Sequence, residues 1–186
     1  LLLIALISYS PSDPNFIFPE NTQIENLLGF RGSYVSDLFF QSVGFIAYLI
    51  PLSYIFTGIN IFRKKEIFLL VENNFFVVIY SFVGSFFFSY FYKNAFTLYI
   101  NGNGGFVGNY LNQTFIINIV NSNENIFYFI LAIIIAVFFL FSINFNPKNF
   151  ILGLKKIIQI FLRKKNKNYT NENEIINEYI PQEEIK

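Results

Sequence analysis

Long apolar runs separated by polar stretches dominate the chain. Two of them, residues 75–92 and 126–143, each continue for about 18 residues without a charged side chain. A helix rises about 1.5 Å per residue and the hydrocarbon core of a bilayer is about 30 Å thick, so each run is close to the shortest spanning helix. A soluble core of this size does not need two helices that are apolar on every face. The pattern therefore predicts a membrane protein.

Two further apolar runs extend this pattern. Residues 38–62 carry no charge, and the chain begins inside an apolar run that ends before Pro11 and Pro14. Because this first run lacks a methionine start, we expect a truncated transmembrane helix; a signal peptide is the alternative, although no Ala-x-Ala-like cleavage site follows. The predicted fold is an all-α membrane domain over residues 1–145. Its four transmembrane helices are predicted at about 1–9, 38–62, 67–92 and 126–143, with outer loops at 10–37 and 93–125.

Two positions within the predicted spans carry more specific expectations. Pro51 lies in the middle of the second span, where a proline kinks a helix unless neighbouring groups satisfy the freed carbonyl. Glu72 lies in the first turns of the third span, close to Arg63, Lys64 and Lys65. A carboxylate is favourable at a helix N-terminus and can still reach headgroup water there. A proton-coupling or ion-coupling role for Glu72 is the alternative.

The tail divides into two parts. Apolar residues from Phe150 to Leu162 recur at helical spacing, with basic residues on or beside the other face. We predict a basic amphipathic helix over residues 146–165 that lies on anionic lipid; contact with nucleic acid is the alternative. Residues 166–186 are polar and acidic, as at the start of a disordered linker. The candidate lipid contacts are Lys155, Lys156, Arg163, Lys164 and Lys165.

The distribution of basic residues predicts the orientation in the membrane. Ten of the 13 lysines and arginines lie in residues 63–65 and 148–167, whereas the two predicted outer loops contain only Arg31 and Lys93. Cytoplasmic loops carry an excess of lysine and arginine. We therefore expect the first set, and with it the C-terminal tail, to be cytoplasmic.

The composition argues against an enzyme. Charged residues make up 13% of the chain, and cysteine and histidine are absent. Their absence removes disulfides, thiolate nucleophiles, Cys/His zinc sites and histidine acid–base chemistry. No paired carboxylates or nucleophile–base pair are evident. The glycine-rich stretch at 101–105 lacks the Gly-Lys-Ser/Thr ending of a phosphate loop. We expect no catalysis, no metal and no cofactor in this chain.

One motif occurs twice. Gly29-Phe-Arg-Gly-Ser-Tyr-Val35 and Gly105-Phe-Val-Gly-Asn-Tyr-Leu111 share the pattern Gly-Phe-x-Gly-[Ser/Asn]-Tyr-[Val/Leu]. Each copy lies between the members of a predicted helix pair, so a duplicated helical hairpin would explain the repeat. Chance similarity in a sequence rich in glycine and aromatic residues is the alternative. We expect each copy to start a short helix at the outer surface, with glycine providing the turn.

These segments together resemble a known family. The stretch Ser8-Tyr-Ser-Pro-Ser-Asp-Pro14 resembles its Ser-Tyr-x-Pro-x-Asp-Pro exit from the first span, and residues 26–40 resemble its Asn-x-x-Gly-x-x-Gly-[small]-aromatic-x-[Ala/Ser]-Asp-x-x-Phe pattern. The proline-bearing second span and Gly104-Gly-Phe-Val-Gly108 also fit. On these motifs, residues 1–145 resemble the N-terminal four-helix membrane domain of FtsK/SpoIIIE-type bacterial DNA translocases.

The resemblance implies a function that the composition does not. In that family this domain anchors the protein in the inner membrane at the division septum, and a linker leads to a hexameric ATPase motor that binds DNA, ATP and magnesium and drives chromosome segregation. The resemblance implies inner-membrane lipid, septum proteins and other copies of the chain as partners, with DNA bound only through the motor. Candidate outer-surface contacts are Ser33, Asp37, Gly105 and Gly108. A fragment of a small transporter or a membrane scaffold is the alternative.

Overall fold

The structure, a computed structural model, describes residues 1–15, 23–93, 101–147, 155, 158 and 159. It consists of two compact units, Leu1–Phe145 and Asn146–Lys186, which are considered separately. The described part of the chain is helical and contains no strand. Its elements in chain order are α1 (Leu2–Ile7), α2 (Gly29–Val43), the 3-10 helix η1 (Gly44–Tyr48), α3 (Leu49–Lys64), α4 (Leu69–Phe91), α5 (Gly105–Leu111), α6 (Ile116–Asn121) and α7 (Glu124–Ser142).

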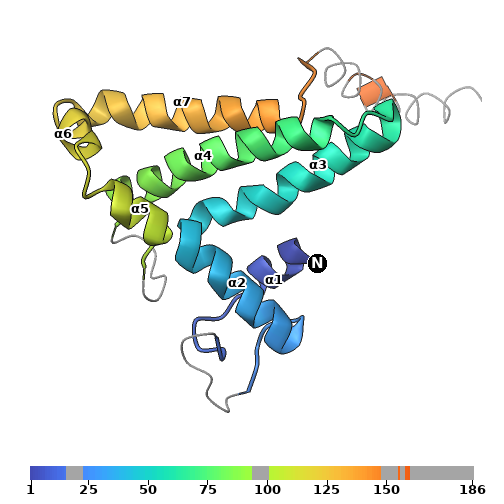
Figure 1. Cartoon of the computed structure of the whole chain (residues 1–186), viewed down its shortest axis with the longest axis horizontal. Helices are drawn as coiled ribbons and strands as arrows, with labels where there is room; N and C mark the ends of the chain where they lie inside the picture. Colours follow the sequence, from blue (N-terminus) through green and yellow to red (C-terminus); the bar gives the residue numbers. More distant parts are fainter. Residues whose placement is uncertain (16–22, 94–100, 148–154, 156–157, 160–186) are drawn as a thin grey trace, which may run out of the picture. The chain divides into compact units, whose positions relative to one another are not determined.

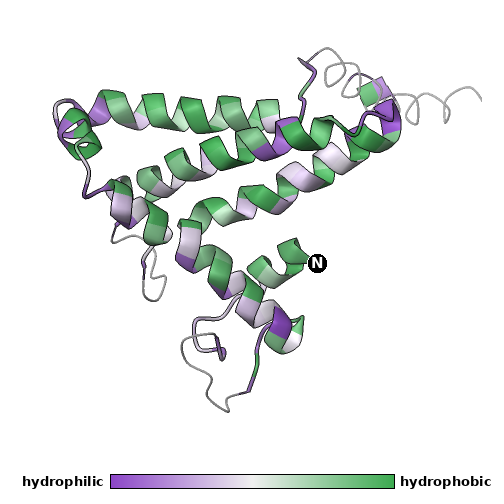
Figure 2. Ribbon diagram, in the orientation of Figure 1, coloured by the Kyte–Doolittle hydropathy of each residue, from purple (hydrophilic) through white to green (hydrophobic). Residues whose placement is uncertain are grey.

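Three helical segments within the described residues are long and apolar enough to cross a membrane: Gly29–Lys64, Leu69–Phe91 and Glu124–Ser142. Figure 2 shows α7 as hydrophobic over almost its entire length. The bounds of α4 and α7 lie within two residues of the predicted third and fourth spans. Within the predicted first span the structure has α1, whose six residues are fewer than a spanning helix needs.

The second predicted span differs from the structure in both its start and its bend. Helix begins at Gly29 instead of residue 38, and the segment is broken at η1 into α2 and α3. The break occurs at Gly44, whose φ of 71° and ψ of −149° belong to glycine alone. Pro51 lies in the first turn of α3, where its missing N–H removes no helical hydrogen bond. Glycine therefore makes the bend that the sequence assigned to proline.

The predicted loops also contain helix. Residues 29–37 belong to α2, and the stretch between α4 and α7 holds α5 and α6. The helix start and the glycine turn expected for each repeat motif are confirmed, but of the two helices only α5, with 7 residues, is short, whereas α2 has 15. The first residue of α2, Gly29, has a φ of 64°, and the first residue of α5, Gly105, has a φ of 63°.

Helix α4 is the centre of the first unit, and it lies between α3 and α7 in contact with both (Figure 1). Ile46 of η1 packs over Gly84 of α4 and joins Ile50, Val77 and Tyr80 in one buried apolar cluster. A second cluster holds α1 against α2 and η1, and its buried members are Leu6, Phe40 and Ala47. The small residues Gly84 and Ala47 let the helices approach closely.

Buried polar side chains tie α3, α4 and α7 together near one end of the bundle. The Ser53 hydroxyl lies 2.9 Å from the hydroxyls of both Tyr80 and Ser142. The Asn73 amide donates to Thr57 Oγ1 at 2.7 Å and to the Ser142 carbonyl at 3.0 Å. Such interhelical hydrogen bonds are favourable in lipid, where an unpaired polar group has no water to replace its partner.

The second unit is described at only a few positions. Lys155 is helical and exposed, and the interfacial helix expected over residues 146–165 stays a prediction. The other candidate lipid contacts, Lys156, Arg163, Lys164 and Lys165, lie outside the described residues, as does the predicted linker over 166–186.

Candidate functional site

The predicted exit from α1 and the segment leading into α2 meet at Asp13. One oxygen of its buried carboxylate accepts a hydrogen bond from the backbone N–H of Glu25 at 2.7 Å. The other oxygen accepts one from the backbone N–H of Asn26 at 2.9 Å. Two charge-assisted bonds from one side chain fix where the chain returns towards the start of α2.

Asn26 extends this junction to the end of α1. Its side-chain amide donates to the carbonyls of Ala5 at 2.9 Å and Ser8 at 3.1 Å, which are end carbonyls of α1. Its side-chain oxygen accepts from the backbone N–H of Leu28 at 3.1 Å. The last carbonyls of a helix have no partner within the helix, so this buried asparagine acts as a distant cap for α1.

Ser33 and Asp37, on the next turns of α2, complete the junction. The Ser33 hydroxyl donates to the carbonyl of Pro14 at 2.7 Å. The Asp37 carboxylate accepts from the Tyr9 hydroxyl at 3.1 Å and from the Gln41 amide at 3.3 Å. Separate hydrogen bonds of these motif residues thus join α1 and the segment after it to α2. We call these residues the α1–α2 junction: Tyr9, Asp13, Asn26, Ser33 and Asp37.

The second copy of the repeat packs against the bend after α2. The backbone N–H of Phe45 donates to the carbonyl of Asn103 at 2.9 Å, across the break at Gly44. The side-chain oxygen of Gln41 accepts a hydrogen bond from the backbone N–H of Asn101 at 3.1 Å. The backbone carbonyl of Gln41 accepts one from the side-chain amide of Asn101 at 3.2 Å. These three bonds join the loop before α5 to the bend, and we call this set of contacts the Gly44 lock.

Gly105 and Gly108 let α5 approach its neighbours. A Cβ at Gly105 would lie 2.7 Å from backbone atoms of Ser42 and Gly44. A Cβ at Gly108 would lie 2.3 Å from the carbonyl oxygen of Ser85 in α4. Both positions are buried because the backbones themselves are in contact there.

The four candidate outer-surface contacts therefore have a different place from the one predicted. Ser33 and Asp37 are 1% and 4% exposed, and Gly105 and Gly108 are buried against α2 and α4. Small and polar residues between two predicted spans suggest a loop that faces water. In this structure the glycines and short polar groups make helix–helix contacts within the first unit, so they are buried and not exposed at its surface.

Aromatic residues of the same two motifs do reach the surface. Phe30 and Tyr34 in α2, and Phe106 and Tyr110 in α5, each form a pair one helical turn apart with ring centroids 6.4 Å from each other. Phe30, Phe106 and Tyr110 are more than half exposed. The signal was present in the sequence, since the shared pattern places Phe and Tyr at i and i+4. Their matching geometry supports a true repeat.

No group of three or more Asp, Glu, His or Cys residues within the described ranges is placed to hold a metal ion. The arrangement that the motifs produce is therefore a set of helix junctions: α1 to α2 through Asp13 and Asn26, and the bend of the second span to α5 through Asn103. Its chemical capability is to fix the relative positions of helices.

Comparisons with known proteins agree with the motifs. A segment of 60 residues, 32% of the chain, is 42% identical to DNA translocase FtsK of Rickettsia bellii, and a segment of 66 residues, 35% of the chain, is 37% identical to DNA translocase FtsK of Pseudomonas putida. Each aligned segment spans only 8% of the relative's length. No solved structure matches the chain. The family described as the 4TM region of DNA translocase FtsK/SpoIIIE matches residues 1–151. This chain belongs to that family.

Proposed function

We propose that this chain is the anchoring and septum-targeting domain of a DNA translocase that acts in chromosome segregation and cell division. One observation carries the proposal: the residues of the family-like motifs are committed to joining helices, at the α1–α2 junction and at the Gly44 lock. Such residues build a rigid membrane platform, and a platform is what a motor on a linker requires.

The mechanism follows from tethering. A domain held at the septum raises the local concentration of whatever is linked to it, without any new contact to DNA. In this proposal an ATPase motor beyond the linker supplies ATP and magnesium binding, DNA contact and hexameric assembly. The domain itself resides in the bacterial inner membrane with a cytoplasmic C-terminal tail, in contact with septum proteins and with other copies of itself.

Deletion of residues 1–145 from the full-length protein is expected to disperse a fluorescently tagged version from midcell. A matched control replaces the deleted residues with an unrelated membrane domain of the same number of spans. We expect the replacement to restore membrane fluorescence but not midcell foci. Midcell foci in the deletion variant would contradict anchoring by this domain, and foci in the replacement variant would reduce its role to tethering.

A second part of the proposal concerns residues 146–165 as a lipid-surface helix. A synthetic peptide of these residues is expected to sediment with vesicles that contain anionic lipid, and each basic residue near the surface contributes about 1 kcal/mol. Replacing Lys155, Lys156, Arg163, Lys164 and Lys165 by glutamine should abolish sedimentation. Equal binding to neutral vesicles would contradict an electrostatic contact.

The alternative of a small transporter has one observation in its favour, the buried polar groups between α3, α4 and α7. Most of these groups bond to each other across helices, as Ser53, Tyr80 and Ser142 do, which is the arrangement of helix-packing contacts. Solute flux into liposomes that carry the purified chain would favour the transporter. A scaffold without a motor predicts septum localisation but no effect on chromosome segregation when residues 1–145 are deleted.

A further inference from the structure

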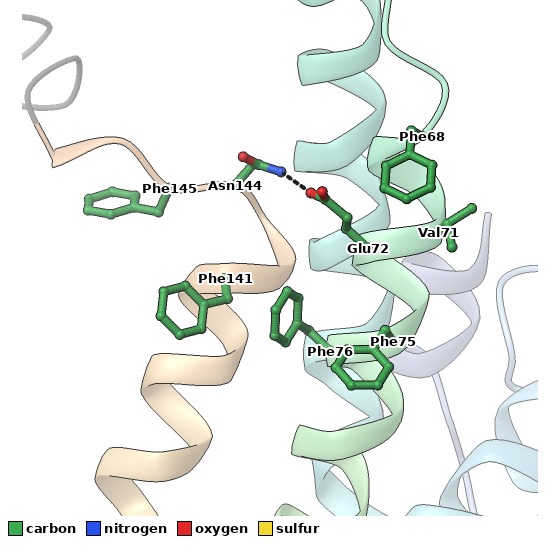
Figure 3. Close-up of a pocket in the computed structure, with 8 residues that line it drawn as sticks. All are labelled: Phe68, Val71, Glu72, Phe75, Phe76, Phe141, Asn144 and Phe145. Carbon is green, nitrogen blue, oxygen red and sulfur yellow. Dashed lines mark hydrogen bonds between the residues drawn. The ribbon is translucent and has the colours of Figure 1, made fainter.

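A cavity of about 550 Å³ opens between the start of α4 and the end of α7. Its walls are aromatic, and Figure 3 shows Phe68, Phe75 and Phe76 on the α4 side with Phe141 and Phe145 on the α7 side. Among the residues that the structure describes, two polar side chains line it, Glu72 and Asn144. A mostly apolar cavity with a few convergent polar groups is the usual form of a small-ligand site.

Asn144 is held towards the cavity by the way α7 ends. The backbone N–H of Phe145 donates to the Leu140 carbonyl at 3.0 Å, and that of Asn144 donates to the Phe141 carbonyl at 3.0 Å. These bonds form a Schellman motif, and Asn144 occupies its left-handed position with a φ of 53°. Asparagine tolerates this conformation better than most residues, so the cap explains the backbone but not the side chain.

The side chain of Asn144 donates a hydrogen bond to the Glu72 carboxylate at 3.2 Å (Figure 3). Among the residues that the structure describes, this amide is the hydrogen-bond partner of Glu72, although the sequence placed Glu72 close to the basic residues 63–65. A carboxylate with one neutral partner and aromatic walls has unused acceptor capacity. It is therefore well placed to bind a cation.

The aromatic walls favour the same kind of ligand. Phe76 lies between Phe75 and Phe141, with ring centroids at 5.4 and 5.5 Å. The face of an aromatic ring attracts a cation that lies within about 6 Å of its centroid, and a primary ammonium such as that of lysine is one such cation. An ammonium group can also donate hydrogen bonds to Glu72 and to the side-chain oxygen of Asn144.

The surroundings of the cavity indicate where the ammonium group comes from. Phe68, Val71, Phe75 and Phe141 are more than half exposed, so the cavity opens onto the side of two membrane-spanning helices. Exposed Arg63, Lys64 and Lys65 precede Phe68 closely in the chain and offer cations for a phosphate. A zwitterionic lipid has this combination of ammonium, phosphate and apolar chains.

We propose that the cavity binds a membrane lipid with a primary ammonium headgroup, of the phosphatidylethanolamine class. The ammonium group donates to Glu72 and lies against the phenylalanine rings. The acyl chains follow the apolar surface of α4 and α7. This site does not depend on septum targeting or on a motor, and it gives the anchor a preference for one kind of lipid.

The test uses the 186-residue chain in nanodiscs with equal amounts of phosphatidylethanolamine, phosphatidylcholine and phosphatidylglycerol of identical acyl chains. Lipids that stay bound after mild detergent release are counted by native mass spectrometry. We expect phosphatidylethanolamine to be enriched, and Glu72→Gln to lower that enrichment about tenfold, as the loss of a charged hydrogen bond would. Phe76→Leu should lower it less.

Glu66→Gln is the matched control, because it removes the same charge from an exposed position between α3 and α4, just before the helix that carries Glu72. It should leave the enrichment unchanged, and the circular dichroism of all variants should match the parent chain. Equal retention of the three lipids, or an unchanged profile for Glu72→Gln, would overturn the proposal. Equal retention of phosphatidylcholine and phosphatidylethanolamine would overturn the primary ammonium. A dimer that Glu72→Gln abolishes, without enriched lipid, would assign the cavity to a second copy of the chain.

Discussion

Replacing Gly44 by alanine is expected to destabilise the protein by about 3 kcal/mol or more, because it combines backbone strain with a steric clash. The backbone at Gly44 has a positive φ with an extended ψ, a region that L-residues avoid. A Cβ there would lie 2.0 Å from the Asn103 carbonyl oxygen, the acceptor for the Phe45 N–H. The substitution therefore damages the bend and the Gly44 lock together.

Gly58 provides the matched control within the same span. It lies in α3, and nothing is within 4 Å of a Cβ built there. Gly58→Ala should be neutral or stabilise the helix by up to about 1 kcal/mol, since alanine has the higher helix propensity. The midpoint of unfolding in mixed micelles of increasing SDS content, followed by circular dichroism, measures both variants. Similar midpoints for the two would show that the bend does not depend on Gly44.

Asn26→Ala is expected to cost about 3 kcal/mol, the second largest effect. The substitution removes two donors from the end carbonyls of α1 and one acceptor from the Leu28 N–H, all at a site that is 4% exposed. Each lost bond costs about 1 kcal/mol, and a buried group left without a partner costs about 1–3 kcal/mol. We therefore expect α1 to detach from α2 before the rest of the unit unfolds.

Limited proteolysis reports this detachment, because a released α1 exposes the chain before α2. The control is Asn118→Ala, at an exposed position in α6 for which we expect a change within about 0.5 kcal/mol. If Asn26→Ala left both the cleavage rate and the unfolding midpoint unchanged, the α1–α2 junction would not depend on the Asn26 side chain.

The sequence predicted the bounds of a span well where hydropathy alone was enough to define them. The runs that became α4 and α7 are apolar on all faces and end at polar residues, so their bounds followed from hydropathy alone. The repeat predicted where α2 and α5 begin, because the positive φ at each helix start is a local conformation that glycine adopts easily. These features depend on residues close together in the chain.

The sequence predicted less well those features that depend on contacts between residues far apart in the chain. Pro51 is a strong local bend signal, yet the bend lies at Gly44, because the loop at 101–105 packs there and leaves no room for a side chain. Ser33 and Asp37 look like surface residues until Pro14 and Tyr9 are brought to them from the segment that follows α1. The cavity beside Glu72 also needs the end of α7. Hydropathy predicted where α7 ends, but it could not predict that this end lies beside the start of α4.

The Gly44 lock also sets an order of events during synthesis. The bend after α2 contains the Phe45 N–H, whose acceptor is the Asn103 carbonyl in the loop before α5. At a synthesis rate of about 5–20 residues per second, the ribosome reaches Asn103 several seconds after Phe45. Until then the acceptor for that amide does not exist, so the bend at Gly44 can reach its final geometry only after the loop before α5 has been made.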